Sequence, residues 1–488
     1  MSDSKFLDAS RWAGKLFLGK WQPAVAGTLP VNEPATGAEL GHVGQGSPAD
    51  VAAAVKRAKA AQPAWAALDH RSKIALLLKV AGGIEANFEE LIGWVIRETG
   101  SFRPKAELEL NETIAIFRQA AGMLSESQGV ILPSRPGRLS YGKRAPHGVV
   151  GVISPFNFPM LLGARAIAPA LATGNTVVVK PDPRTSVTGG VMLARLIEDA
   201  GFPEDVFHML PGGADVGKAL VEHPDTNLIC FTGSTAAGRA IGETCGRLLK
   251  RFSLELGGKS PLIILEDADL DVAASNAAFG AFLHQGQICM ASGRILVQER
   301  VAEEFTKRLA ARAEHLPVGN PATDNVALGP LISEVQRDRV HAIVTESVKQ
   351  GATLAAGGSY EGLFYRPTVL AGVKPGMRAY SEEVFGPVAN VISFGSDDDA
   401  VNIANDTPYG LSSAIITPSL KRAMSIGERV NAGMLHINSQ TVADEASNPF
   451  GGRGASGNGG NIGGPANWDL FTQWRWVTID DEALATPF

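Results

Sequence analysis

Apolar and polar residues alternate in blocks through the middle of the chain, and these blocks predict a repeated order of strand and helix. Between Gly148 and Gly258, short apolar runs of strand length are separated by longer segments in which apolar residues recur at helical spacing. The expected strands are "GVVGVISP", "NTVVVKP", "VFHMLPGG", "NLICFTGS" and "RFSLELGG". The expected helices run through "LLGARAIAPALATG", "VTGGVMLARLIEDAG", "ADVGKALVEHP" and "TAAGRAIGETCGRLLK". This order predicts a parallel sheet covered by helices.

A second alternating series follows Gly258 and predicts another sheet of the same kind. Its expected elements are "SPLIILED", a helix that ends at Cys289, "RILVQE", the basic helix "VAEEFTKRLAARAEHL", "SSAIIT" and "MLHINS". Upstream of both series, long amphipathic helices are expected in "PADVAAAVKRAKAAQPAW" and "HRSKIALLLKVAGGIEANFEELIGWVIRETG". The strand-like segments "RLSYGKRAP" and "FTQWRWVTID" fit neither sheet, and we expect them to pair as an arm between subunits.

These patterns predict an α/β protein with two parallel-sheet domains and a small β arm for oligomerisation. A chain of 488 residues is longer than one hydrophobic core usually supports. We expect the first domain in residues 1–127 and 147–257, the second in 258–465, and the arm in 128–146 and 466–488.

Composition narrows the function classes. The net charge of −6 is spread along the chain, so there is no basic footprint for nucleic acid or for an anionic membrane. The three cysteines have no paired spacing, so neither a disulfide framework nor a metal site is expected. The N-terminal residues are polar and lack the apolar core of a signal peptide. We therefore expect a cytoplasmic protein.

One apolar stretch, from Gly148 to Val179, is long enough for a membrane span. Pro155, Asn157 and Pro159 interrupt it, which divides the stretch into strand, turn, helix and strand. A buried strand–helix–strand unit is therefore the preferred interpretation.

The segment "HQGQICMASGR" places Cys289 among small and polar residues after an apolar run. A free cysteine is often just a small buried hydrophobe. A loop beside a helix end also suits a nucleophile, but a thiol needs help to ionise near neutral pH. Neither lysine nor histidine is immediately adjacent in sequence, so a nucleophilic Cys289 needs a helper from elsewhere in the chain.

Two other positions offer groups that could assist a nucleophile. Glu255 alternates with apolar residues in "FSLELGG"; it is either a paired or solvent-facing carboxylate, or a buried general base with a raised pKa. Asn157 in "SPFNFP" is either a turn residue or a rigid amide donor to an oxyanion. One such donor contributes roughly 3–4 kcal/mol to catalysis.

Two strand ends carry candidate anion-binding groups. In "FTGSTAAGRAIG", Gly233 permits a tight turn, and Ser234 or Thr235 can cap a helix whose free amides suit a pyrophosphate. Lys180 ends the strand "VVVKP", where parallel sheets bind ligands, although a lysine there is otherwise simply solvated. The G-x-G-x-x-G spacing in "NPFGGRGASGNGG" has neither a strand before it nor a helix after it, and it indicates a glycine-rich loop.

Six motifs together resemble the aldehyde dehydrogenase superfamily, and the resemblance covers nearly the whole chain. They are "PFNFP", "VVVKP", "FTGSTAAG", "LELGGKSP", "GQICMA" and "EEVFGPV". Within this superfamily the chain is most similar to the benzaldehyde and related aromatic-aldehyde dehydrogenases. That closer similarity lies in "KPDPRT", "HQGQICMASGR", "HINSQTVADE" and "GGPANWDLFTQWRW".

The resemblance implies NAD(P)-dependent oxidation of an aromatic aldehyde such as benzaldehyde to the carboxylic acid. Cys289 would form a thiohemiacetal, Asn157 and the Cys289 backbone amide would hold its oxyanion, and hydride transfer would leave a thioester. Glu255 would then activate water to release the acid. The resemblance also implies a Rossmann-like NAD(P)-binding first domain, a catalytic thiol second domain and a homo-oligomer, a dimer or a tetramer.

The cofactor contacts implied by the resemblance lie mainly at the strand ends of the first domain. Lys180 would bind the adenosine ribose, Ser234 the pyrophosphate and Glu383 the nicotinamide ribose. The full set expected at the cofactor is Ile153, Ser154, Pro155, Phe156, Lys180, Asp182, Gly213, Gly217, Phe231, Gly233, Ser234, Glu383 and Phe385.

Three positions depart from common members of the superfamily. Phe156 stands where many have tryptophan, which alters packing rather than chemistry. Pro183 stands where many NAD-preferring relatives have a glutamate that repels the 2′-phosphate of NADP. Asp182 comes one residue earlier and would point another way. NAD is therefore the expected preference, with NADP also accepted. Gln473 replaces a second glutamate and cannot act as a base, which leaves that work to Glu255.

Candidate substrate-pocket residues are Phe158, Leu162 and Phe450, together with Arg165, which has an equal claim to a structural role. Three alternatives stay open: oxidation of aliphatic aldehydes or semialdehydes, a cofactor-independent thiol hydrolase or acyltransferase, and a non-catalytic relative. A hydrolase would not explain Lys180, Ser234 and Glu383 together.

Overall fold

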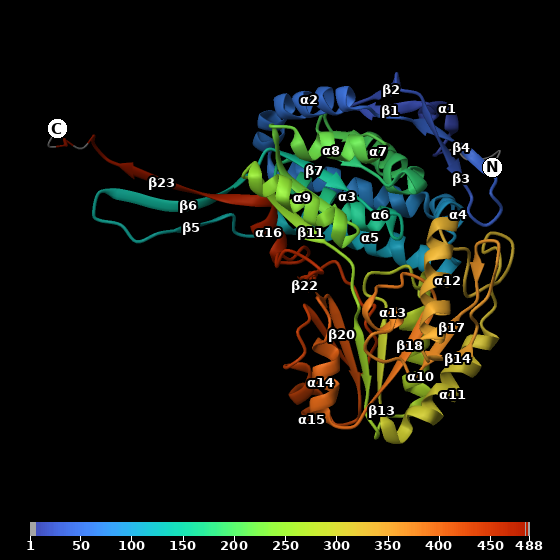
Figure 1. Cartoon of the computed structure of the whole chain (residues 1–488). Helices are drawn as coiled ribbons and strands as arrows, with labels where there is room; N and C mark the ends of the chain where they lie inside the picture. The colour runs from blue at the N-terminus through green and yellow to red at the C-terminus, as the bar shows by residue number, and fades with distance from the viewer. Residues whose placement is uncertain (1–5, 484, 487–488) are drawn as a thin grey trace.

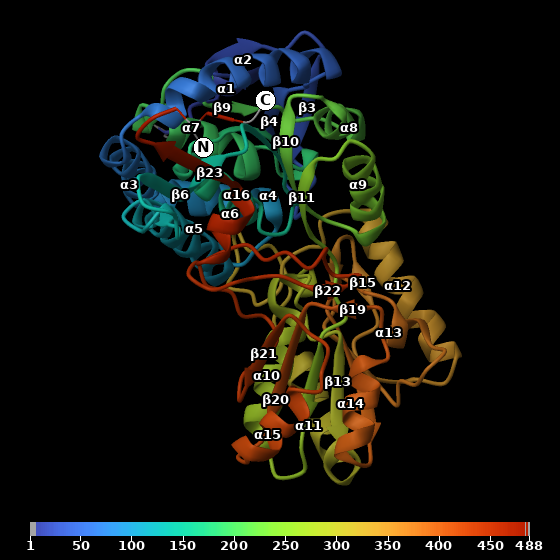
Figure 2. The same cartoon turned by 90° about the vertical axis from the view of Figure 1, so that its left-hand side faces the viewer.

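Two sheets with their helices and a projecting β arm make up the molecule in the computed structural model, which describes residues 6–483 and 485–486 (Figures 1 and 2). This confirms the expected α/β class. Residues 1–5, 484 and 487–488, at the ends of the expected first domain and arm, lie outside the described residues.

The first sheet has seven strands in the order β11-β10-β7-β8-β9-β1-β2. Its parallel part consists of β11 (Arg251–Glu255), β10 (Thr226–Thr232), β7 (Val149–Ile153), β8 (Thr176–Lys180) and β9 (Phe207–Met209). The antiparallel edge consists of β1 (Lys15–Leu18) and β2 (Trp21–Pro23). These parallel strands coincide with the strands expected from the apolar runs.

Helices cover both faces of this sheet, so successive strand residues enter different cores. On β7, Val149 and Ile153 join one core, whereas Val150 and Val152 join the other. One face carries α2 (Pro48–Ala67), α8 (Ala214–Glu222) and α9 (Thr235–Arg247). The other carries α6 (Pro159–Ala172) and α7 (Met192–Ala200), backed by α3 (His70–Ala86), α4 (Phe88–Thr99) and α5 (Arg103–Met123). Short turns η1 (Pro183–Thr185) and η2 (Val187–Val191) precede α7.

The single helix expected over residues 70–100 is wrong in one respect, because Asn87 divides it into α3 and α4. Asn87 leaves helical geometry, with φ −116° and ψ 20°, and its side-chain amide donates to the Gly83 carbonyl at 2.8 Å. Asparagine competes with the backbone for hydrogen bonds in this way, which favours a helix end over a helix interior.

The second sheet also has seven strands, in the order β14-β17-β18-β13-β12-β20-β21. They are β14 (Thr353–Ala356), β17 (Thr368–Ala371), β18 (Val388–Phe394), β13 (Arg294–Gln298), β12 (Pro261–Ile264), β20 (Ser412–Ile416) and β21 (Met434–Ile437). Its helices are α10 (Leu270–Phe282), α11 (Glu299–His315), α12 (Glu334–Lys349), α13 (Arg378–Ser381), α14 (Asp397–Asn405) and α15 (Leu420–Gly427). All pairings are parallel except that of β14 with β17.

The helix expected to end at Cys289 ends earlier, at Phe282. A tight turn, η3 (Leu283–Gly286), follows α10, and within it His284 and Gln285 have left-handed φ values of 48° and 56°. Cys289 therefore lies in the loop between this turn and β13.

The arm is a three-stranded sheet in the order β23-β6-β5 that projects from the body of the molecule (Figure 1). It comprises β5 (Gly129–Ile131), β6 (Arg138–Pro146) and β23 (Thr472–Asp480), and α16 (Ala466–Phe471) joins it to the body. The two strand-like segments pair with each other within the chain, as expected, while the role of the arm between subunits stays a prediction. Smaller elements are α1 (Ala9–Trp12), β3 (Thr28–Asn32), β4 (Glu39–Gly44), β15 (Tyr360–Glu361), β16 (Phe364–Tyr365), β19 (Tyr409–Gly410) and β22 (Arg453–Gly454).

The apolar stretch from Gly148 to Val179 forms β7, α6 and most of β8, so the strand–helix–strand interpretation is confirmed. Within the described part of the chain, no helix combines the length and the apolar character that crossing a membrane requires.

Candidate active site between the two sheets

Four neighbouring parallel strands of the first sheet end at the same edge, and their last residues line one cavity. These residues are Ile153, Lys180, Thr232 and Glu255. The cavity measures about 390 Å³, and Cys289 lines it as well. The carboxyl edge of a parallel sheet is where such folds bind ligands. The candidate residues Lys180, Glu255 and Cys289 therefore lie together at the expected ligand-binding edge.

Cys289 is held close to the chain that follows Glu255. A Cβ added to Gly258 would collide with the Cys289 carbonyl oxygen, so only glycine permits this approach. The Cys289 residue is half-buried, whereas Cys230 and Cys245 are fully buried in strand and helix. Burial raises the pKa of the Cys289 thiol well above its usual range, and the charges of Glu383 and Glu255 add to this. The thiol therefore needs a proton acceptor before it can attack.

Glu255 is buried, with 7 % of its surface exposed, and neither carboxylate oxygen has a hydrogen-bond partner among the described residues. Burial raises the pKa of Glu255 well above the usual value; the Arg165 charge opposes this and Asp444 adds to it. A carboxylate with a raised pKa and free lone pairs is suited to accept a proton near neutral pH. Glu255 is therefore neither solvent-facing nor hydrogen-bonded to a basic group among the described residues, and its role as a general base stays a prediction.

Asn157 lies between β7 and α6, buried on the cavity wall. Its side-chain nitrogen donates to the backbone carbonyl of Gln287 at 2.9 Å. An amide nitrogen carries two hydrogens, so this bond fixes the side chain while one donor stays free for a ligand. The bond joins the first sheet to the loop that carries Cys289.

Most of the expected cofactor residues line the same cavity. They are Ile153, Ser154, Pro155, Phe156, Lys180, Asp182, Phe231, Gly233, Ser234, Glu383 and Phe385. Gly213 and Gly217 lie outside this lining. Gly213 is the N-cap residue of α8, and a Cβ on Gly217 would lie 3.8 Å from the Lys180 side chain.

The polar groups along the cavity are placed to receive an anionic, hydroxyl-bearing ligand. Ser234 caps α9 by accepting from the Ala237 backbone amide at 3.3 Å, at a helix end that favours anions. Burial lowers the pKa of the Lys180 ammonium. The Ser154 hydroxyl is buried without a hydrogen-bond partner among the described residues, and Glu383 accepts from the Gly258 amide at 3.0 Å.

The Asp182 carboxylate accepts hydrogen bonds from Arg184, two residues later in the chain. Arg184 donates to its carboxylate through Nε at 2.8 Å and Nη2 at 2.7 Å. The Arg184 guanidinium also lies 4.2 Å from the centre of the Phe156 ring, which packs edge-on against Phe385 at 5.8 Å. This arrangement places a carboxylate, a cation and two rings together on the cavity wall.

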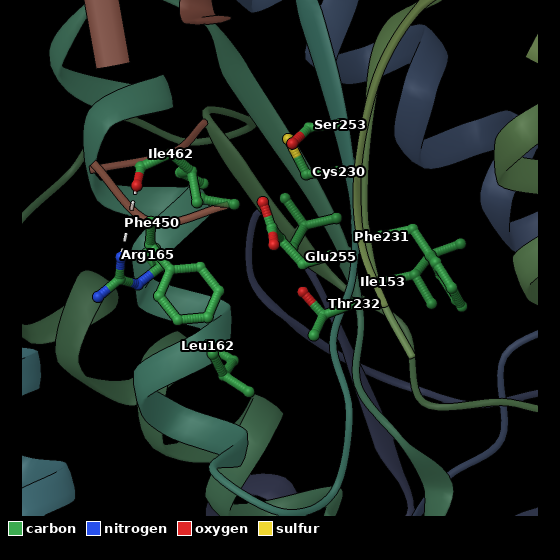
Figure 3. Close-up of a pocket in the computed structure, with 12 residues that line it drawn as sticks. Ile153, Leu162, Arg165, Cys230, Phe231, Thr232, Ser253, Glu255, Phe450 and Ile462 are labelled. Carbon is green, nitrogen blue, oxygen red and sulfur yellow. Dashed lines mark hydrogen bonds between the residues drawn. The ribbon is translucent and has the colours of Figure 1, made fainter. Parts of the chain in front are cut away.

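A smaller cavity adjoins Glu255 on the side of α6. Leu162, Arg165 and Phe450 line it, and Figure 3 shows Glu255 and Arg165 on opposite sides. It has about 20 Å³ of free space, room for a single water molecule. Arg165 forms an ion pair with Asp444.

Phe158 and Gln473, like Gly213 and Gly217, lie outside both cavity linings. The Phe158 ring packs edge-on against His284, with 5.7 Å between ring centres. Gln473 is exposed on the arm, where it donates to the Pro146 carbonyl at 3.4 Å. Among residues 6–483 and 485–486, no group of histidine, cysteine, aspartate or glutamate side chains is arranged to hold a metal ion.

Sequence reasoning missed several residues of the cavity wall. Thr232 stands inside the motif "FTGS" and could have been found there. Gln336 and Arg339 lie on α12, far along the chain, and they hold the opposite wall. Gln336 donates to the Phe385 carbonyl at 2.7 Å, and Arg339 to the Glu383 carbonyl at 2.6 Å. No local pattern marks such long-range contacts. The remaining cavity residues not anticipated are Arg184, Leu256 and Gly257.

Comparisons with known proteins agree with this geometry. The sequence pattern of the Aldehyde dehydrogenase family matches residues 21–477. The vanillin dehydrogenase of Amycolatopsis sp. is 53% identical over 99% of this chain and 100% of its own length. The benzaldehyde dehydrogenase [NAD(+)] of Pseudomonas putida is 47% identical over 98% of each chain. The crystal structure of a salicylaldehyde dehydrogenase from Pseudomonas putida G7, complexed with salicylaldehyde, superimposes with a TM-score of 0.94 at 35% identity, over 97% of this chain and 99% of that one.

Proposed function

The chain belongs to the aldehyde dehydrogenase family, and on that premise we propose that it oxidises aromatic aldehydes such as benzaldehyde to carboxylic acids with NAD as the preferred cofactor. The observation that carries the proposal is that Cys289, Glu255 and Asn157 line one cavity together with the expected cofactor residues. Each of the three comes from a different element, as a nucleophile, a base and an oxyanion donor require.

In the proposed reaction, the Cys289 thiol first gives its proton to solvent, and the thiolate sulfur then attacks the carbonyl carbon to form a thiohemiacetal oxyanion. The free N–H of the Asn157 amide and the Cys289 backbone N–H hold the oxyanion that develops. A bound nicotinamide, held through Lys180, Ser234 and Glu383, would supply the hydride acceptor for this oxidation, and the thiohemiacetal on Cys289 would become a thioester. Glu255 then takes a proton from a water molecule that attacks the thioester, and the acid leaves as the Cys289 thiolate is restored.

The residues present fit a dinucleotide. Donors for hydroxyl and phosphate oxygens come from the Ser154 hydroxyl, which has no partner among the described residues, from the N-terminus of α9 at Ser234, and from the Lys180 ammonium. Lys180 is assigned to the adenosine ribose, Ser234 to the pyrophosphate and Glu383 to the nicotinamide ribose. We assign Gly213 and Gly217 to close backbone approach beside this site.

The substrate end of the cavity supports an aromatic ring. Leu162 lines both cavities, whereas Phe450 lines only the smaller one beside Glu255, and we assign Phe450 to the aromatic surroundings of the substrate. Arg165 forms an ion pair with Asp444, and its guanidinium lies 5.0 Å from the centre of the Phe450 ring. We therefore assign Arg165 to positioning Phe450. We assign Phe158 to support behind the pocket. The names of the relatives, which include vanillin and benzaldehyde dehydrogenases, favour aromatic over aliphatic aldehydes or semialdehydes.

We further propose that residues 1–127 and 147–257 form the NAD(P)-binding domain, 258–465 the catalytic domain, and 128–146 and 466–488 the oligomerisation arm. Exposed apolar residues on the arm, with Trp476 70 % exposed, support assembly into a dimer or tetramer. Three free cysteines favour a cytoplasmic setting.

A panel of aldehydes assayed with NAD and with NADP tests the proposed function. We expect benzaldehyde and ring-substituted benzaldehydes to give higher kcat/KM values than aliphatic aldehydes or succinic semialdehyde. Equal values for both classes would reject the aromatic preference. A thiol hydrolase would instead turn over esters without binding either nicotinamide nucleotide, which a fluorescence titration with NADH detects.

A further inference from the structure

The N-terminus of α6 is capped from another helix. Phe158, the N-cap residue, supplies no side-chain hydrogen bond. Glu109 on α5 does so instead: its Oε1 accepts from the backbone amides of Met160 at 2.9 Å and Leu161 at 3.4 Å. The first amides of a helix have no partner within the helix, and a carboxylate there also complements the helix dipole. Glu109 therefore fixes the backbone shortly after Asn157.

Lys105, one turn before Glu109 on α5, forms an ion pair with the Glu109 carboxylate. Its Nζ lies 2.6 Å from Glu109 Oε2, and both side chains are fully buried. A buried ion pair is often no more stable than apolar residues of the same volume, so stability alone does not explain the pair. The Lys105 Nζ also lies 4.2 Å from the centre of the Phe158 ring. The pair thus holds both the start of α6 and the side chain next to Asn157.

Phe158 links this pair to the loop of Cys289. Its ring packs edge-on against His284, which adopts a left-handed backbone conformation that residues other than glycine seldom adopt. Such a conformation persists only where the surroundings hold it. The same loop presents the Gln287 carbonyl that accepts from the Asn157 amide at 2.9 Å. The Asn157 amide and the Cys289 loop, which together would form the oxyanion site, are therefore both positioned by contacts with Phe158, and Phe158 is positioned by the buried Lys105–Glu109 pair.

We propose that Glu109 and Lys105 are positioning residues that set the distance between the Asn157 amide and the Cys289 loop. The inference rests on the proposed function, in which these two groups hold the oxyanion. Neither Glu109 nor Lys105 lines the cavity, so neither touches the substrate. Their effect is on the step in which the oxyanion develops, and it leaves cofactor binding unchanged.

A double-mutant cycle between Glu109→Gln and Asn157→Ala tests this. Displacement of a reacting group by about 1 Å can cost a hundredfold in rate, so we expect Glu109→Gln to lower the rate of the NADH burst by about 10- to 100-fold. The Kd for NADH, measured by fluorescence, should stay within about twofold, because the cofactor residues are untouched. In the Asn157→Ala background, Glu109→Gln should lower the burst rate little further, since both act through the same amide. Multiplicative losses, or an unchanged burst rate in the single variant, would overturn the proposal.

Two further variants separate positioning from folding. Lys105→Met/Glu109→Met removes both buried charges, so it should fold and still lose the burst rate. A folded double variant with the normal burst rate would overturn the proposal even if Glu109→Gln does not fold. The matched control is Lys73→Met: Lys73 is another buried lysine, 5.7 Å from the Trp65 ring centre and remote from the cavity. It should change thermal stability but leave the burst rate unchanged.

Acylation of Cys289 by p-nitrophenyl acetate gives a readout independent of the aldehyde and the cofactor. The tetrahedral oxyanion of the ester uses the same donors, so Glu109→Gln should slow p-nitrophenol release in parallel with the burst. If the wild-type protein oxidised no aldehyde, the proposed function would fail. In that case, slower p-nitrophenol release in Glu109→Gln would still support the positioning role of Glu109. An unchanged rate of release would overturn it.

Discussion

The side-chain amide of Asn157 donates a 2.9 Å hydrogen bond to the backbone carbonyl of Gln287, two residues before Cys289. This bond joins the end of β7 in the first sheet to the loop that follows α10 in the second. The amide that would stabilise an oxyanion is thereby fixed relative to the proposed nucleophile before any ligand binds.

Asn157→Ala removes both that bond and the oxyanion donor. We expect kcat for aldehyde oxidation to fall by about 10²- to 10³-fold, the range for loss of one oxyanion donor. Stopped-flow measurement of the NADH burst should place the loss in the step before or at hydride transfer. A normal burst rate would show that Asn157 is only a structural tie between the sheets.

Glu255→Gln should separate the two halves of the reaction. Hydride transfer precedes hydrolysis, so the burst of NADH should survive while steady turnover falls by at least about a hundredfold. In the wild type, burial holds the pKa of Glu255 well above its usual value, so the basic form is gained only as pH rises. Steady turnover should therefore increase with pH from the acidic into the neutral range. Loss of the burst itself in the variant would place Glu255 earlier, as the base for the Cys289 thiol.

We expect cofactor choice to depend on the charge pair of Asp182 and Arg184, which follows β8. The Arg184 guanidinium donates two hydrogen bonds to the Asp182 carboxylate. The 2′-phosphate of NADP would therefore be bound by Lys180 alone, without help from Arg184. We expect NAD to be preferred by less than about ten-thousandfold in kcat/KM, or about 5.5 kcal/mol, because Pro183 cannot repel the phosphate. Asp182→Asn should release Arg184 and raise kcat/KM for NADP about tenfold, since guanidinium groups bind phosphate well.

The control for that variant is Glu85→Gln, which breaks an exposed pair with Arg118 away from the cavity. It should leave the NAD-to-NADP ratio unchanged. An unchanged ratio in Asp182→Asn would show that Arg184 does not reach the 2′-phosphate. A wild-type preference beyond ten-thousandfold would show that another group excludes NADP.

The exposed face of the arm should mediate self-association. Trp476 is 70 % exposed and Ile131 76 %, an unusual amount of apolar surface for a free sheet. We expect sedimentation to give a species larger than the 51.2 kDa chain, and Trp476→Glu to shift it towards smaller species. Val25→Glu, at another exposed apolar residue, should not. A wild-type monomer would rule out this role for the arm.

The strands of the first sheet were predictable from sequence because burial on both faces requires nearly continuous apolar runs, as in β7 and β8. The same logic located Lys180, since a polar residue that ends such a run lies at the sheet edge, whereas Glu255 was found because it alternates with apolar residues. The break at Asn87 and the early end of α10 depend on single side-chain contacts and a left-handed turn, which periodicity does not reveal.

Contacts between distant segments were the least predictable part of the site. Glu109 reads as one polar residue in a helical pattern, yet it caps α6 some fifty positions later. Arg339 reads as an ordinary helix cation but holds the loop of Glu383. These long-range contacts depend on how the helices pack against each other. The residues around Glu109 or Arg339 in the sequence do not indicate them.

Replacement of the thiol in Cys289→Ala is the decisive test of Cys289 as the nucleophile. The variant should bind NADH with unchanged affinity in a fluorescence titration, because the cofactor residues lie on other elements. With benzaldehyde and NAD it should give neither a burst nor steady turnover. Retention of even a tenth of the wild-type turnover would contradict the thiohemiacetal route and the account built on it.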